Sequence, residues 1–194
     1  MKKILVVSIL ILVSLIAYAE KCEGTIIMLN NDTVECTFVL RNLRTTHVGE
    51  RLVMYKKMEA IVKGKRKFYA AKDISGFTIK SSEKWFIYDS VNTLSSDGTL
   101  FMCREHDGEA LLVHTCIQGD IITGDVTYHH VIRKKEEENQ AHFSHDNFSV
   151  NGSLVTFFED CPVILDKIES KEAVLTSANT YLELAKLYEN ECSN

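Results

Sequence analysis

The feature that most constrains the fold is a series of short β-branched and aromatic runs, separated by turn residues, between about residues 24 and 132. Such runs are typical of β-strands. Asn30-Asn31-Asp32 and Asp107-Gly108 are turn sequences that would join consecutive strands as hairpins. The expected strands are Gly24–Leu29, Thr33–Leu40, Arg51–Tyr55, Arg66–Ala70, Gly76–Ile79, Trp85–Val91, Thr99–Arg104, Glu109–Ile117 and Val126–Ile132.

The pattern changes to helical spacing near residue 160. Asp160 is placed to cap a helix that has Pro162 in its first turn, and a second helix is expected from Thr180 to Glu191. The sequence therefore predicts a mainly β (α+β) protein. We expect one domain over residues 20–194, an antiparallel sheet forming a roll or barrel-like sandwich, with a helical hairpin at about 160–192.

Six cysteines are available for disulfides. Two helices joined by a short connection pack antiparallel, which would bring Cys161 close to Cys192 and allow a disulfide there. Zinc is the less favoured alternative, because the sequence has no Cys-x-x-Cys pair. The pairing of the other four, Cys22, Cys36, Cys103 and Cys116, is left open, although a tight turn at Asp107-Gly108 would put Cys103 opposite Leu112 and away from Cys116.

The first nineteen residues have the three parts of a secretory signal peptide. Lys2 and Lys3 precede an apolar run, Ile4 to Ile16, and small residues follow at Ala17 and Ala19. The run is shorter than the ~20 residues that a membrane-spanning helix needs, and no later stretch is long and apolar enough. We expect cleavage after Ala19. We expect no lipid on Cys22, because charged residues precede it, and delivery to the periplasm or the cell exterior.

Removal of the leader would leave 20 basic and 27 acidic residues, a net charge of −7. An acidic chain is poorly suited to neutralise phosphates, so nucleic acid is not an expected partner. The basic residues are nevertheless concentrated at Lys56, Lys57, Lys63, Lys65, Arg66 and Lys67. They could form a patch for an anionic glycan or lipid headgroup, helped by Phe68 and Tyr69. The interpretation that we favour is that these lysines protect a sheet edge from pairing.

The nearest approach to a metal site is His142-Phe143-Ser144-His145-Asp146, which offers two imidazoles and a carboxylate. His142, His145 and Asp146 are weak candidate ligands, because metal binding needs a fixed geometry that this segment does not predict. Exposed loop residues are the favoured interpretation, and no cofactor is expected. The sequence has neither a Gly-x-Ser-x-Gly elbow nor a phosphate-binding glycine loop.

Several short motifs resemble a loose group of uncharacterised secreted or periplasmic proteins of Bacteroidetes-type bacteria. They are Gly24–Leu29 followed by Asp32-Thr33-Val34, then Asp73-Ile74-Ser75-Gly76-Phe77, then Asp160-Cys161-Pro162. The last is Tyr188-Glu189-Asn190-Glu191-Cys192, in which Glu189 is inserted relative to the pattern. The resemblance implies an exported bacterial protein and supplies no catalytic residues.

These observations favour an exported, non-enzymatic binding or structural module, with a glycan or a cell-envelope protein as the partner to expect. Two alternatives stay open. One is a small secreted metal-assisted hydrolase that uses His142, His145 and Asp146. The other is a binder of anionic glycan or lipid through the segment from Lys56 to Lys67.

Overall fold

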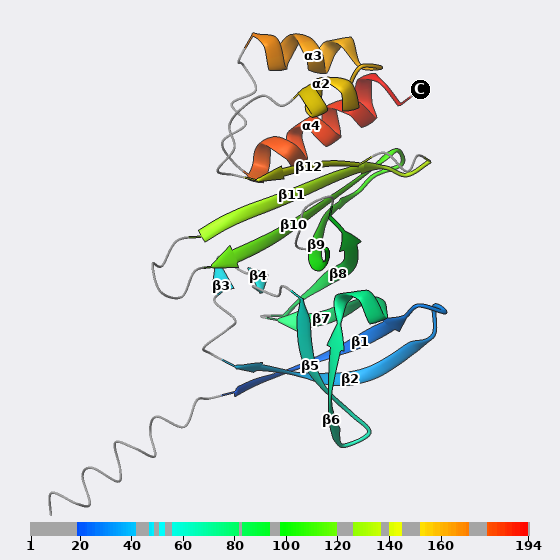
Figure 1. Cartoon of the computed structure of the whole chain (residues 1–194), viewed down its shortest axis with the longest axis vertical. Coiled ribbons are helices and arrows are strands. Elements are labelled where there is room, and N and C mark those ends of the chain that lie inside the picture. Colours follow the sequence, from blue (N-terminus) through cyan, green and yellow to red (C-terminus); the bar gives the residue numbers. More distant parts are fainter. Residues whose placement is uncertain are drawn as a thin grey trace, which may run out of the picture.

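The computed structural model describes residues 19–41, 47–48, 51–52, 56–81, 83–93, 98–119, 126–136, 140–144, 152–170 and 178–193. The fold is mainly β, with helices at its C-terminal end (Figure 1). The large sheet holds β1 (Ala19–Met28), β2 (Thr33–Arg41), β5 (Lys57–Val62), β6 (Lys65–Ala70), β7 (Ile74–Ser81), β8 (Lys84–Asn92), β9 (Thr99–Asp107), β10 (Leu111–Gly119), β11 (Val126–Lys134) and β12 (Gln140–Ser144). The other elements are β3 (His47–Val48), β4 (Arg51–Leu52), the 3₁₀ turn η1 (Ala71–Asp73), α2 (Gly152–Phe157), α3 (Pro162–Glu169) and α4 (Ala178–Glu191).

The ten strands of the large sheet follow the order β12-β11-β10-β9-β8-β7-β1-β2-β5-β6, and every pair is antiparallel. After β6 the chain returns through η1, and β7 pairs with the free side of β1. The sheet therefore grows in two directions from the β1–β7 pair and ends in two edge strands, β6 and β12 (Figure 1). An antiparallel sheet is confirmed, but the described strands do not close into the expected barrel-like sandwich.

The first core lies on the face of the sheet where β1, β2 and β5 curl toward β8 and β9. Phe77 is at its centre, with ring centroids 5.1 Å from Phe38, 4.8 Å from Tyr88 and 5.0 Å from Phe101. Aromatic side chains of this size contribute a large share of the apolar burial that drives folding. Gly24 makes room for this packing, because a Cβ there would collide with the Phe38 ring and the Thr78 carbonyl oxygen.

The second core lies between the helices and strands β10 and β11 (Figure 1). It contains the buried side chains of Leu111 and Ile132 from the strands, with Phe158, Ile164 and Tyr188 from the helical region. On α4 the buried side chains are Thr180, Tyr181, Leu184, Ala185 and Tyr188. The helices thus cover one face of the C-terminal half of the sheet.

The structure differs from these expectations at several elements. Of the strand predicted at Arg51–Tyr55, Arg51 and Leu52 form β4 and the other residues lie outside the described ranges, while the unpredicted strand β5 begins at Lys57. The strand β12 and the helix α2 were not predicted, because their sequences lack a clear period. The first C-terminal helix follows Cys161 rather than Asp160, since the Asp160 carboxylate instead binds the side chains of Lys134 and Tyr188.

The predicted disulfide between Cys161 and Cys192 is present, with a Cα–Cα distance of 5.6 Å. Cys22, Cys36, Cys103 and Cys116 are thiols. In the strand pairing, Cys22 is not directly opposite Cys36, and Cys103 is not directly opposite Cys116. Cys22 lies opposite Phe38 while Cys36 lies opposite Gly24, and Cys103 lies opposite Thr115, which places Cys116 on the other face of the sheet.

The expected signal peptide falls on residues outside the described ranges, except for Ala19, which begins β1. Among the described residues, no helix combines the length and the apolarity needed to cross a membrane.

The disulfide generates a first prediction. The double substitution Cys161→Ala/Cys192→Ala should lower the free energy of unfolding by about 3–4 kcal/mol, because the unfolded chain regains the freedom of the closed loop. Urea denaturation measures this. Reductant should destabilise the parent protein by a similar amount and leave the double variant unchanged. A reductant effect of equal size on both proteins would contradict the assignment.

Candidate functional site

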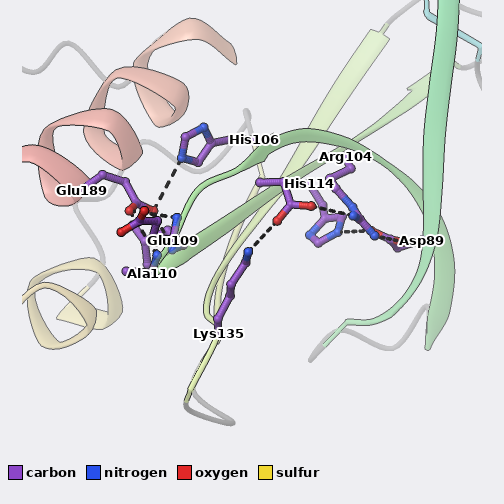
Figure 2. Close-up of polar contacts among 10 residues, drawn as sticks. Asp89, Arg104, His106, Glu109, Ala110, His114, Lys135 and Glu189 are labelled. Carbon is purple, nitrogen blue, oxygen red and sulfur yellow. Dashed lines mark hydrogen bonds and ion pairs between the residues drawn. The ribbon is translucent and has the colours of Figure 1, made fainter. Parts of the chain in front are cut away.

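Two polar clusters and one charged surface stand out among the described residues. The first, the β8–β10 cluster, consists of Asp89, Arg104, Asp107, His114 and Lys135 (Figure 2). Arg104 donates to both oxygens of Asp89, from Nε to Oδ2 and from Nη2 to Oδ1, each at 2.7 Å. His114 Nε2 lies 2.7 Å from Asp89 Oδ2. Asp89 is thus held by two strands at once.

The same cluster extends to the end of β11. Arg104 Nη1 donates to Asp107 Oδ2 at 2.7 Å, and Lys135 Nζ lies 2.6 Å from Asp107 Oδ1. Asp89, Arg104, Asp107 and Lys135 therefore form a chain of ion pairs in which negative and positive groups alternate. The strand register brings Asp89, Arg104 and His114 together. Arg104 on β9 is the direct partner of His114 on β10, and Asp89 on β8 lies opposite Met102, two residues from Arg104.

The cluster changes the ionisation of its carboxylates. Burial alone would raise the pKa of Asp89, but hydrogen bonds from His114 and Arg104 outweigh burial and lower that pKa to about 2. Lys135 and Arg104 likewise lower the pKa of Asp107, against a smaller opposing effect of burial. Both carboxylates are therefore ionised at neutral pH.

The His114–Asp89 pair is arranged like the base and orienting acid of a catalytic triad. His114 is 1 % exposed, however, and its Nδ1 is buried with no hydrogen-bond partner among the described residues. A base enclosed in this way has no access to a substrate in solution. Asp89 is also bound bidentately by Arg104, so the geometry assigns these groups to holding the strands together.

The second cluster is a carboxylate bound by backbone amides. Glu189 of α4 accepts hydrogen bonds from the N–H groups of Glu109, Ala110 and Leu111, at 3.1, 3.0 and 2.8 Å (Figure 2). Successive N–H groups that converge on one anion form a nest. His106 Nε2 lies 3.7 Å from the same carboxylate. The Glu189 nest therefore attaches the last helix to the turn between β9 and β10.

This nest explains why the predicted turn at Asp107-Gly108 was wrong in detail. Asp107 pairs with Leu112 and Gly108 N–H donates to the Leu111 carbonyl, so the loop is wider than two residues. A Cβ on Gly108 would collide with the Glu189 carboxylate. The register is shifted again between Val113 and His114. The strand register predicted from the local sequence could not take into account that Glu189, about eighty residues later, binds the backbone of this turn.

The Glu189 nest also lowers an acid pKa. Burial would raise the pKa of Glu189, but the hydrogen bonds from Leu111 and Ala110 and the nearby His106 outweigh it. The net shift is downward, which favours the ionised carboxylate in the folded protein.

Of the residues predicted as metal ligands, only His142 lies within the described ranges, in β12 opposite Val131. His145 and Asp146 lie outside the described residues. No group of three or more His, Cys, Asp or Glu side chains that could hold a metal occurs in the described part of the chain. His130 is buried, with Nδ1 3.0 Å from Thr115 Oγ1 and its ring 4.4 Å from that of Tyr181.

The third feature is the cationic hairpin, defined here as residues 56–70, which comprises β5, β6 and the turn between them. Six of the 22 basic residues of the chain and one of its 27 acidic residues fall in this segment. All six basic side chains are exposed. The acid, Glu59, forms an ion pair with Arg66 at 3.4 Å. Lys63, Lys65 and Lys67, three of the predicted patch residues, form no ion pair with another described residue.

The cationic hairpin is anchored from one side. Met58, Ala60 and Val62 of β5 are buried in the first core, while β6 is the edge strand of the sheet. Phe68 on β6 is 71 % exposed. The position of β6 agrees with the expectation of lysines at a sheet edge. The exposed aromatic ring beside them is not needed for edge protection.

Comparison of the chain with protein-family models, with curated proteins and with solved structures found no match. The resemblance to exported Bacteroidetes-type proteins therefore stays a prediction, and a function has to be argued from the geometry.

The Glu189 nest predicts a pH-dependent loss of stability. Glu189→Gln should lower the free energy of unfolding by about 1–3 kcal/mol at pH 7, because amides lose a charged acceptor. The folded-state pKa of Glu189 is depressed, so its contribution is present above the unfolded pKa and is lost as pH falls through the folded value. Urea denaturation from pH 7 to 3 should show the two proteins converging below about pH 4. A constant difference would contradict the ionic role.

The β8–β10 cluster generates a matched pair of substitutions. Asp89→Asn should cost about 3–5 kcal/mol, because it leaves the buried His114 without its anionic partner and removes one of the two carboxylates that bind Arg104. Asp107→Asn should cost no more than about 1 kcal/mol, since the Asp107 side chain is 44 % exposed. Thermal and urea unfolding at pH 7 measure both. Equal effects of the two substitutions would show that Asp89 is not the centre of the cluster.

Proposed function

We propose that this chain is an exported binding module whose ligand is a polyanion and whose binding surface is the cationic hairpin. Export is supported by the residue pattern of Met1–Ala19 and by the disulfide, which is typical of oxidising compartments.

The observation that carries the proposal is the separation of charge within the chain. The cationic hairpin has a net charge of +5, whereas the other residues contain sixteen basic and twenty-six acidic side chains. A local potential of opposite sign to the rest of the molecule orients an anionic ligand as it approaches. The ligand is attracted to the hairpin and repelled elsewhere.

The other charged groups of the structure support this choice of surface. In the β8–β10 cluster each carboxylate contacts a cation, and the Glu189 nest satisfies its carboxylate with backbone amides. Lys63, Lys65 and Lys67 are exposed cations that no described acid neutralises. They are free to contact an external anion. The hairpin is also preformed, because β5 is packed into the first core, so little ordering is required on binding.

Charge reversal within the hairpin tests the proposal. Dextran sulfate should bind the parent protein with an affinity that falls as salt rises, and neutral dextran should not bind. Lys63→Glu/Lys65→Glu/Lys67→Glu should weaken the binding of dextran sulfate at least about tenfold, because three attractive contacts become repulsive. Fluorescence anisotropy at about 50 mM salt, where screening is weak, measures the affinity.

The matched control is Lys21→Glu/Lys167→Glu/Lys186→Glu, which makes the same change in net charge with exposed lysines outside the hairpin. It should change the affinity much less. Equal losses in the two triple variants would mean that net charge, and not this surface, controls binding. Failure of the parent protein to bind dextran sulfate would reject the proposed function.

A further inference from the structure

The outer side of β6 offers unpaired backbone groups. Lys63 and Gly64 both have positive φ, 50° and 75°, and they lie between the paired residues Val62 and Lys65. This is the geometry of a two-residue type I′ turn, whose closing pair is hydrogen-bonded. Because the direction of N–H and C=O groups alternates along a strand, those of Lys65 and Lys67 face β5. Those of Arg66 and Phe68 face the outer side, where β6 has no neighbour among the described strands.

The side chains along this edge select among possible strands. Lys65 and Lys67 lie on one face of the sheet, and Arg66 and Phe68 lie on the other, because successive side chains alternate. An added strand would meet cations on both faces. A second copy of β6 would be repelled, because like charges directly opposite each other are destabilising. A strand with acidic side chains would instead place an anion opposite each of Lys65, Arg66 and Lys67.

We infer that the anionic ligand is an acidic polypeptide segment that binds in extended conformation as an additional strand on β6. This inference rests on the proposed function and names its partner. Main-chain hydrogen bonds to Arg66 and Phe68 provide the attachment, as in other cases of strand addition. The cations determine which sequences are accepted.

The geometry also specifies the sequence pattern of the ligand. Acidic residues lie opposite Lys65, Arg66 and Lys67. A β-branched residue lies opposite Phe68, whose 71 % exposed ring then acquires a cross-strand neighbour. An antiparallel segment of this kind reads Thr-Thr-Val-Glu-Glu-Glu-Thr, and this peptide, acetylated and amidated, serves as the probe.

Substitution of Phe68 separates backbone pairing from charge. Phe68→Pro removes the outward N–H and leaves the hydrogen bonds between β6 and β5 intact, and proline is tolerated on edge strands. It should weaken binding of the peptide roughly tenfold relative to Phe68→Ala, which removes the ring and keeps the N–H. Binding of dextran sulfate should be the same for both variants, which also shows that the hairpin remains folded.

Two isomeric peptides give a second test with the unmodified protein. One is N-methylated at positions 3 and 5 and the other at positions 4 and 6, so each carries two methyl groups and their charge and composition are identical. Strand addition requires that one isomer binds about as well as the parent peptide and the other at least about tenfold more weakly, because only one edge of the peptide pairs with β6. Isothermal titration calorimetry measures both.

The outcomes distinguish this inference from the proposed function. If both isomers bind equally, or if Phe68→Pro and Phe68→Ala bind the peptide equally, strand addition is wrong while polyanion binding stands. If dextran sulfate binds and the acidic peptide does not, the ligand is an acidic glycan and the inference is overturned. If neither binds, both proposals fail.

Discussion

The pairing of β1 with β7 is the interaction on which the rest of the structure depends. Strands β2, β5 and β6 join the sheet through β1, and strands β8 to β12 join it through β7. The aromatic packing around Phe77 lies on this pair and includes Phe38 from one side and Tyr88 and Phe101 from the other. Gly24 and Gly76 lie on the two paired strands, where a Cβ would collide with the backbone of the adjacent strand. The two halves of the sheet therefore share a core as well as a ladder.

The polar groups divide into those that maintain this architecture and those that do not. Asp89, Asp107 and Glu189 are each bound by cations or backbone amides, and each has a lowered pKa. They attach strand to strand and helix to turn. By contrast, Lys63, Lys65 and Lys67 of the cationic hairpin are exposed and form no ion pair with another described residue. The cationic hairpin carries a charge opposite to that of the rest of the chain, which is why we propose it as the binding surface.

The sequence allowed the strands with clear turns and alternation to be predicted, from β6 through β11 within a few residues. The disulfide was also predictable, because two short helices have few ways to pack and Cys161 and Cys192 lie at matching ends. Strand β5 was missed because its apolar residues alternate only after Lys57, past a strand-like run at Arg51–Tyr55.

The polar clusters could not be predicted, for a different reason. The contact of Asp89 with His114 depends on a register shift between β9 and β10 that has no distinctive residue pattern. The sequence around Glu189 likewise gives no indication of its role. Only the position of α4 relative to the β9–β10 turn shows what this acid binds. Local residue patterns therefore indicated the strands and helices. The β8–β10 cluster and the Glu189 nest instead depend on contacts between segments that are far apart in the sequence.

The central position of β1 has a consequence for the order of folding. β1 is the first of the described strands to be synthesised, yet Gly24 pairs with Ile79 and Ile27 with Gly76, about fifty residues later. β1 and β2 can pair early, but one side of β1 stays open until β7 has emerged. Contacts of such high sequence separation slow folding, and during that interval the chain exposes an apolar strand edge. A chain that crosses a membrane unfolded would meet this interval on the far side, where the disulfide could form only once Cys192 had arrived.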